Sequence, residues 1–329
     1  MPAGQTKQPE ADRAVIARQA QIGAKRRWRL IYPTAWKGVC DSPIEIQLHG
    51  KGVTKPEGQF KAGLTARRSA AKAKGMSNDP RLFLDSPYAP SARLALSRED
   101  THYILNVMRR GEGDGVRLFN GRDGEWSARI ADAHRKGAIL ELIARTRPQS
   151  SVPDLWLLFA PVKRQKTDLI VEKATELGVG EIHPVTTQRT QADRSKPERF
   201  HIIAKEAAEQ TERLDLPLIA PVERLERVLD GWDPARILYY CDEAGDDDAE
   251  PWGGDAGRAG PMLEVLRADP DGPAALLIGP EGGFSPQERI RLRQLDFVRA
   301  VSLGPRILRA ETAVIAALAL WQAARGDWG

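Results

Sequence analysis

The feature that most constrains this fold is the alternation of apolar, strand-like runs with helical segments from residue 154 to residue 329. The strand-like runs are LWLLFAPV, EIHPV, RILYYC, AALLIG and AVSLG. The helical segments are KTDLIVEKATELG, PERFHIIAKEAAEQTERL, SPQERIRLRQLD and RAETAVIAALALWQAARG. Strands that alternate regularly with helices form parallel sheets, because each helix carries the chain back to start the next strand. The sequence therefore predicts an α/β domain over residues 151–329 with a parallel sheet.

The preceding segment has a different pattern. Residues 81–147 contain short apolar or alternating runs separated by the turn signals Gly111–Gly115 and Asn120–Gly124. One helical segment, REDTHYILNVMRR, interrupts them. This pattern predicts a small β-barrel domain over residues 76–150, which a linker at Arg147–Pro153 joins to the α/β domain.

Charge separates residues 1–75 from the rest of the chain. They carry 15 of its 49 lysines and arginines but only 5 of its 45 aspartates and glutamates, so the rest is net acidic. We expect a disordered basic leader, or a reading frame that truly starts at Met76; an arm that grasps RNA is the alternative. The high net charge thus gives no reason to infer nucleic-acid binding for the folded body.

Composition argues against several classes of protein. The sequence has no apolar run of membrane-spanning length and no apolar segment typical of a secretion signal. Its two cysteines, Cys40 and Cys241, cannot form a disulfide framework, and its five histidines are scattered, so we expect no metal site. We expect a cytoplasmic protein that does not enter a membrane.

The stretch LLIGPEGGFSPQE, from Leu276 to Glu288, joins a strand-like run to a helix. Ser285, followed by Pro286 and Glu288, predicts a capping box that starts the helix. The glycines then lie at the carboxyl end of a parallel strand, where α/β sheets bind ligands. The stretch lacks the lysine of a nucleotide loop, and its one charge, Glu281, favours a cationic ligand over a phosphate. A tight connection with Gly282 or Gly283 in a left-handed conformation is the alternative.

A second stretch, SLGPRILRAETA, repeats this arrangement. A strand-like run ends in Gly304-Pro305, and Arg306, Arg309 and Glu311 follow before an apolar helix. Two such connections in one sheet predict a shared pocket, although Arg309 and Glu311 are also compatible with a simple surface pair.

These two stretches resemble the RsmE-type methyltransferases of the SPOUT superfamily. EKATELGVGEIHPV (Glu172–Val185) and EAAEQTERLDLP (Glu206–Pro217) are similar to middle segments of that family. HYILNVMRRGEGDGVRLFNGRDGEW (His102–Trp126) is similar to its small PUA-like domain. The resemblance covers residues 80–325, and residues 1–75 match nothing in it.

The resemblance implies an activity and a fold. The family transfers a methyl group from S-adenosylmethionine to N3 of a uridine in 16S ribosomal RNA of the small subunit. It works as a homodimer, and its α/β domain carries a C-terminal trefoil knot, an exception to the rule that chains are un-knotted. By match to its motifs we expect cofactor contacts from these residues: Ile278, Gly279, Glu281, Gly283, Leu303, Gly304, Ile307 and Leu308.

Catalysis and RNA contact need polar side chains beyond the glycine loops. Methylation at N3 requires loss of the N3 proton, for which the catalytic candidates are Glu281, Arg309 and Glu311. The candidates for RNA contact are basic residues: Arg81, Arg109, Arg110, Lys163, Arg164, Lys173 and Arg213. Two other functions stay open at this point: an RNA-binding assembly factor without catalysis, and a related SPOUT enzyme that methylates a ribose or a tRNA.

Overall fold

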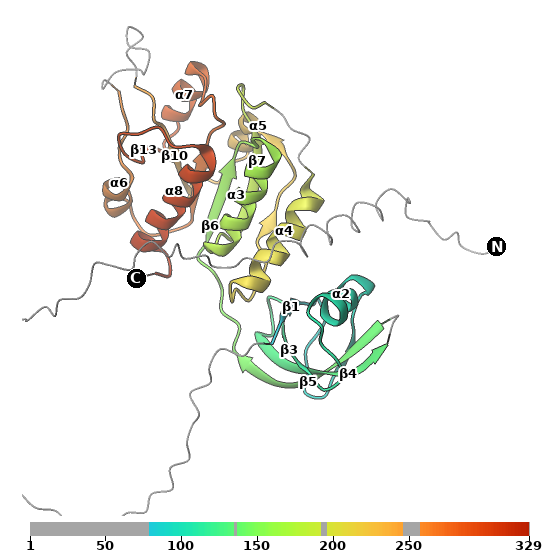
Figure 1. The fold of residues 1–329 in the computed structure, drawn as a ribbon. Coiled ribbons are helices and arrows are strands. Elements are labelled where there is room, and N and C mark those ends of the chain that lie inside the picture. Colours follow the sequence, from blue (N-terminus) through green and yellow to red (C-terminus); the bar gives the residue numbers. More distant parts are fainter. Residues whose placement is uncertain (1–78, 135–136, 192–195, 246–256, 329) are drawn as a thin grey trace, which may run out of the picture. The chain divides into compact units, whose positions relative to one another are not determined.

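The computed structural model describes residues 79–134, 137–191, 196–245 and 257–328. The leader predicted at residues 1–75 lies outside the described residues. The small domain begins at β1, and the large domain begins at β6. Figure 1 shows the small domain in blue to green and the large domain in green to red.

The small domain is a curved five-stranded sheet with one helical segment beside it. Its strands lie in the order β1-β3-β4-β5-β2, and only the β1–β3 pair is parallel. In the described ranges, β1 and β2 remain the two edges of this sheet, so hydrogen bonds between them do not close the predicted barrel. The strands are β1 (Arg81–Phe83), β2 (Arg93–Ala95), β3 (Gly115–Phe119), β4 (Glu125–His134) and β5 (Gly137–Arg147).

The predicted helix of the small domain is divided in two. It begins as α2 (Arg98–His102), capped by the Ser97 side chain, and continues as the π-helical turn η2 (Tyr103–Val107). Arg109 follows in a left-handed conformation with φ of 54°. π-Helical turns and left-handed non-glycine residues are both uncommon and cluster at functional sites, so this segment is a candidate contact surface.

The large domain is built on a parallel sheet, as the sequence predicts. The strands lie in the order β11-β13-β10-β12-β6-β7-β8, with β9 beside β7, and all pairs are parallel. β10 therefore lies between β12 and β13, although it precedes both in the chain. The strands are β6 (Leu155–Phe159), β7 (Glu181–Thr186), β8 (Leu218–Ile219), β9 (Glu223–Arg224), β10 (Ile237–Cys241), β11 (Gly260–Pro261), β12 (Ala274–Ile278) and β13 (Val298–Ser302).

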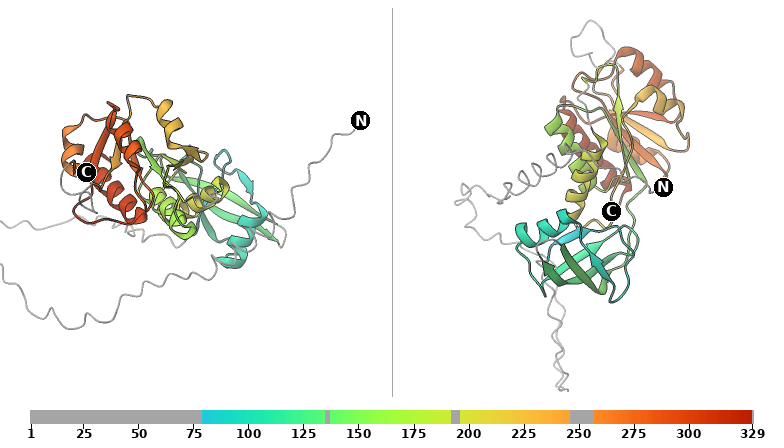
Figure 2. Two further views of the ribbon diagram at one scale, coloured as in Figure 1. Left: turned by 90° about the horizontal axis from the view of Figure 1, so that it is seen from above. Right: turned by 90° about the vertical axis from the view of Figure 1, so that its right-hand side faces the viewer.

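Helices cover both faces of this sheet (Figure 2). One face packs against α3, α4, α6 and α8 through Ile170, Phe200, Leu266 and Val314, and the other packs against α5 and α7. β12 is buried at all five positions because it is covered on both sides. The helices are α3 (Arg164–Glu176), α4 (Pro197–Gln210), α5 (Leu225–Asp230), α6 (Met262–Ala268), α7 (Pro286–Arg293) and α8 (Ala310–Arg325).

The helix ends test the sequence reading in detail. At the start of α7 the Ser285 side chain accepts from the Glu288 N–H, and the Glu288 carboxylate accepts from the Ser285 N–H at 2.8 Å, which confirms the capping box. Gly178 ends α3 with φ of 76°, also as predicted. The prediction for α4 was wrong at its end: the helix stops at Gln210, because Glu212 takes a left-handed conformation with φ of 63°.

Candidate functional site

The loops that follow β10, β12 and β13 lie at one edge of the large sheet. These strands are parallel neighbours, so their carboxyl ends point the same way. The structure therefore brings residues 242–245, 279–285 and 303–309 to this edge, which we call the cofactor edge.

The loop after β12 has a conformation that depends on glycine. Gly283 is left-handed with φ of 66°, and its N–H donates to the Pro280 carbonyl at 2.8 Å. A Cβ on Gly279 would lie 3.0 Å from the ring of Phe284, which is buried beneath the loop. Among the described residues, a Cβ on Gly283 would meet only the Glu243 carboxylate, at 3.8 Å. Gly283 therefore has the left-handed conformation that the tight-connection interpretation predicts, and Gly279 is required by the close approach of the Phe284 ring.

The loop after β13 is exposed. Gly304 is left-handed with φ of 111°, and a Cβ added there would have no atom of the described part of the chain within 4 Å. Ile307 is 74% exposed, while Leu303 and Leu308 pack against the core. A left-handed glycine with free space around it leaves the backbone accessible to a ligand.

Two of the three catalytic candidates meet around a lysine that the sequence reading missed. Lys166, in the first turn of α3, has its Nζ 3.4 Å from Glu311 Oε1 and 3.9 Å from Glu281 Oε1. Glu311 belongs to the first turn of α8, where the helix dipole stabilises a carboxylate. The third candidate, Arg309, is exposed at the N-cap of α8.

A second charged cluster supports the loop after β10. Asp242 is 4% exposed and accepts from Arg289 at 3.0 Å and Arg293 at 2.9 Å, and the Tyr240 hydroxyl donates to it at 2.6 Å. Both arginines belong to α7, so the helix that starts at the glycine loop is tied to the end of β10. Burial raises the pKa of Tyr240 far above its usual value, so the phenol stays protonated as a donor.

Five of the seven candidates for RNA contact fall into three groups. Lys163 and Arg164 are exposed at the start of α3, which follows β6, the neighbour of β12. Arg109 is exposed after η2 in the small domain, with Arg110 partly buried beside it. Lys173 pairs with Glu172 at 3.0 Å and Glu176 at 2.7 Å, so any phosphate must compete with two carboxylates.

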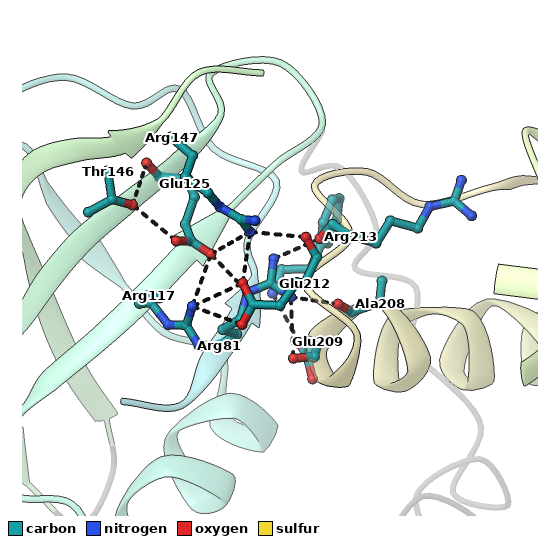
Figure 3. Close-up of polar contacts among 10 residues, drawn as sticks. Arg81, Arg117, Glu125, Thr146, Arg147, Ala208, Glu209, Glu212 and Arg213 are labelled. Atoms are coloured by element: carbon teal, nitrogen blue, oxygen red, sulfur yellow. Dashed lines mark hydrogen bonds and ion pairs between the residues drawn. The ribbon is translucent and has the colours of Figure 1, made fainter. Parts of the chain in front are cut away.

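The prediction for Arg81 and Arg213 was wrong, because both side chains are buried and already bonded within the protein. Arg81 is 5% exposed and donates to Glu125 Oε2 at 2.9 Å and to the carbonyls of Ala208 and Arg213, each at 2.7 Å (Figure 3). Arg213 is 8% exposed and donates to the carbonyls of Thr175 and Val179 at the end of α3. Neither guanidinium can reach a phosphate.

These arginines belong to a junction between the two domains. Glu125 lies at the centre: burial raises its pKa, but the nearby arginines outweigh this and hold the pKa below its usual value. Glu212, from the segment after α4, pairs with Arg117 at 3.0 Å and with Arg147 at 3.1 Å (Figure 3). We call the following residues the domain junction: Arg81, Arg117, Glu125, Arg147, Glu209, Glu212 and Arg213. No sequence pattern marks this junction, because its partners are distant in the chain.

In the described residues no three or more His, Cys, Asp or Glu side chains gather as a metal site would require. Within the same residues, no helix has the length and apolarity to span a bilayer.

Two family models match the chain. A model of an RNA methyltransferase domain matches residues 148–322, and a model of an RNA methyltransferase PUA domain matches residues 96–143. The ribosomal RNA small subunit methyltransferase E of Rickettsia conorii is 30% identical over 240 residues, which cover 73% of this chain and 93% of that protein. The protein of the same name from Synechocystis is 33% identical over 235 residues, which cover 69% and 72%.

Solved structures are similar over the same region. A methyltransferase from Legionella pneumophila, solved with the bound cofactor SAM, has a TM-score of 0.65 and 30% identity and covers 76% of this chain and 99% of that one. A ribosomal RNA small subunit methyltransferase E from Neisseria gonorrhoeae, bound to S-adenosyl methionine, has a TM-score of 0.65 and 26% identity, with coverage of 76% and 100%. The similarity thus extends over almost the whole of both solved chains.

Proposed function

The chain belongs to the RNA methyltransferase family that includes ribosomal RNA small subunit methyltransferase E, and from this premise we propose that it methylates 16S ribosomal RNA with S-adenosylmethionine. The family model covers more than half of the chain, including the whole of the cofactor edge. The observation that carries the proposal is the pair of left-handed glycines, Gly283 and Gly304, in the loops after β12 and β13, the two strands that flank β10.

The residues at the cofactor edge fit S-adenosylmethionine. Gly283 and Gly304 leave space near the backbone, and Glu243 and Glu281 are carboxylates suited to a sulfonium cation and an ammonium group. When bound, the cofactor supplies a methyl group on a positively charged sulfur. We propose that these residues hold it: Ile278, Gly279, Glu281, Gly283, Leu303, Gly304, Ile307 and Leu308.

For the substrate, we propose N3 of a uridine in the small ribosomal subunit, bound partly by the small domain. The match of residues 96–143 to the PUA model and the exposed Arg109 support this role. At the large domain, Lys163 and Arg164 lie at the start of a helix on the cofactor edge and can hold phosphates near it. We also keep Arg110 and Lys173 as proposed contacts.

We extend the proposal to assembly and topology. Ile307 and Ile315 are 74% and 37% exposed, on the loop before α8 and on α8 itself, and a second copy of the chain would cover them as a homodimer. The passage of the chain from β12 across β10 to β13 supports a trefoil knot at the C-terminus. A ribosomal substrate implies action in the cytoplasm.

The test is the product. Ribosomal RNA from a strain that lacks the gene should lose one N3-methyluridine, and the purified protein should restore it on small subunits, as measured by nucleoside digestion and mass spectrometry. A ribose-methylated nucleoside would move the chain to another branch of the superfamily. Failure to bind S-adenosylmethionine in calorimetry would favour an assembly factor without catalysis.

A further inference from the structure

Lys166 joins two carboxylates that come from distant parts of the chain. Its Nζ lies 3.4 Å from Glu311 Oε1 and 3.9 Å from Glu281 Oε1. The side chains of Lys166, Glu281 and Glu311 are 27%, 46% and 14% exposed, so Glu311 is the most enclosed of the three. Because Glu311 is enclosed and Glu281 is exposed, the lysine fixes the orientation of Glu311 more firmly than that of an exposed surface pair.

The second oxygen of Glu311 is the unusual atom in this cluster. Glu311 Oε2 is buried and, among the described residues, has no hydrogen-bond partner. A buried acceptor without a donor costs free energy comparable to a lost hydrogen bond, and such atoms are rare in folded proteins. An atom of this kind at the cofactor edge is suited to a donor that arrives with a ligand.

We infer that Lys166 is a positioning residue: it holds Glu311 Oε1 so that Oε2 accepts the N3 proton of the target uracil. The inference rests on the proposed function and ranks its catalytic candidates. Arg309 cannot accept a proton, because a guanidinium stays protonated in proteins. Glu281 is more exposed, lies farther from Lys166, and belongs to the loop proposed to hold the cofactor.

The proton transfer balances in a simple way. The Glu311 carboxylate takes the N3 proton and becomes a neutral acid, while the electron pair of the N3–H bond remains on nitrogen and forms the new bond to the methyl carbon. The methyl–sulfur bond breaks, and its electrons neutralise the sulfonium. Glu311 then returns the proton to water, and its carboxylate pairs again with Lys166 before the next turnover.

The test uses the full-length protein with small subunits or target RNA under single-turnover conditions. General-base catalysis contributes typically 100-fold or more, so Glu311→Gln should slow methylation by about 100-fold. Lys166→Met should slow it by at least about tenfold, and Lys166→Arg, which keeps the charge, should restore most of the rate. Lys196→Met removes an exposed lysine at the start of α4 and serves as the matched control, with no expected effect.

A binding experiment gives a readout that does not depend on activity. Wild type should bind target RNA more tightly than the same RNA carrying N3-methyluridine, because only the unmodified base offers a proton to Oε2. Lys166→Met and Glu311→Gln should each reduce this preference while the affinity for S-adenosylmethionine and the melting temperature stay close to wild type.

The double variant separates positioning from a structural role. If Lys166 acts through Glu311, adding Lys166→Met to Glu311→Gln should slow methylation no further. A further tenfold loss, a single Lys166→Met variant with wild-type rate, or an equal loss of cofactor affinity would each overturn the inference. If wild type forms no N3-methyluridine, the proposed function fails instead, so the two failures are distinguishable.

Discussion

The domain junction and the cofactor edge are both built from arginine, lysine and glutamate, yet their charges are used differently. At the junction, Arg81 and Glu125 are buried and bonded on several sides. The atoms left without partners there are the Nε donors of Arg117 and Arg147, whose guanidinium groups form other ion pairs. At the cofactor edge, the orphan is a carboxylate oxygen of Glu311. At the junction the carboxylates are fully paired and link the two domains, whereas at the cofactor edge a carboxylate oxygen lacks a donor, and we propose that it takes part in the chemistry.

The largest expected effect is a loss of folding stability on replacing Arg81, at the domain junction. Arg81→Met removes one of the donors to Glu125, which keeps Arg147 and Thr146, and it also removes the Arg81 donors from the carbonyls of Ala208 and Arg213. Breaking a buried pair costs about 3–5 kcal/mol of folding free energy. Urea denaturation measures this loss of folding free energy. Arg129→Met, which removes an exposed pair with Glu141 from the same domain, should cost less than about 1 kcal/mol. Equal losses would mean that the junction is no more important than a surface pair.

The junction should also respond to pH through Glu209. Its carboxylate accepts from the Phe83 N–H at 3.1 Å, and burial raises its pKa to about 7. The folded state therefore keeps a proton that the unfolded chain has released, so this contribution to stability is fully present below the ordinary glutamate value and is lost as the pH rises through 7.

A neutral amide at this position removes that dependence. Wild type should lose stability as the pH rises from 5 to 8, and Glu209→Gln should not. The free energy of unfolding of the variant should therefore rise relative to wild type over this range, by at most about 3 kcal/mol for a shift of this size. Urea denaturation of wild type and of Glu209→Gln at pH 5 and at pH 8 measures this difference in unfolding free energy. A constant difference between them would show that Glu209 ionises normally in the folded protein.

At the cofactor edge the expected effect is on binding. Gly283→Val places a branched side chain at a left-handed position, which costs about 1–2 kcal/mol of stability, and it fills the space beside Glu243. We expect calorimetry to show at least a tenfold weaker affinity for S-adenosylmethionine. Gly113→Val, at another left-handed glycine, should cost similar stability and leave the affinity unchanged. Equal affinities for both variants would remove the loop from the site.

The smallest effect should come from the surface of the small domain. The double variant Arg109→Ala and Arg110→Ala should weaken RNA binding, and the salt dependence of log affinity should flatten by about one unit for each lost phosphate contact. Replacing the exposed Arg224 of β9 and Arg227 of α5 by alanine removes the same charge and should change neither quantity. Parallel salt slopes in the first variant and wild type would exclude this surface.

The sequence predicted the local features of the fold better than the long-range ones. The capping box at Ser285 and the helix end at Gly178 are confirmed, because each depends on residues close in the chain. The order of the strands could not be predicted, since β10 lies between two later strands. Lys166 was therefore missed: only that order brings the start of α3 beside the loop after β12.

The same limit explains why Arg81 and Arg213 were wrongly predicted to contact RNA. In a sequence, Arg81 and Arg213 have the appearance of surface residues next to short strands or helix ends. Their roles depend on carbonyl groups, which every residue carries and which no sequence pattern marks. An arginine that binds phosphate and one that binds a helix end are therefore indistinguishable until the backbone around them is known.

Arg81 also bears on how such a protein can change during evolution. Its guanidinium donates to the Ala208 carbonyl in the last turn of α4, 127 residues away. A residue of the small domain therefore supplies a hydrogen bond at the C-terminal end of a helix of the large domain. A methyltransferase domain transplanted without its small domain would expose that helix end together with Ala208 and Leu214, which pack on Phe119. The two domains are therefore poor candidates for independent shuffling: a new RNA-binding module would have to supply its own arginine at the same place.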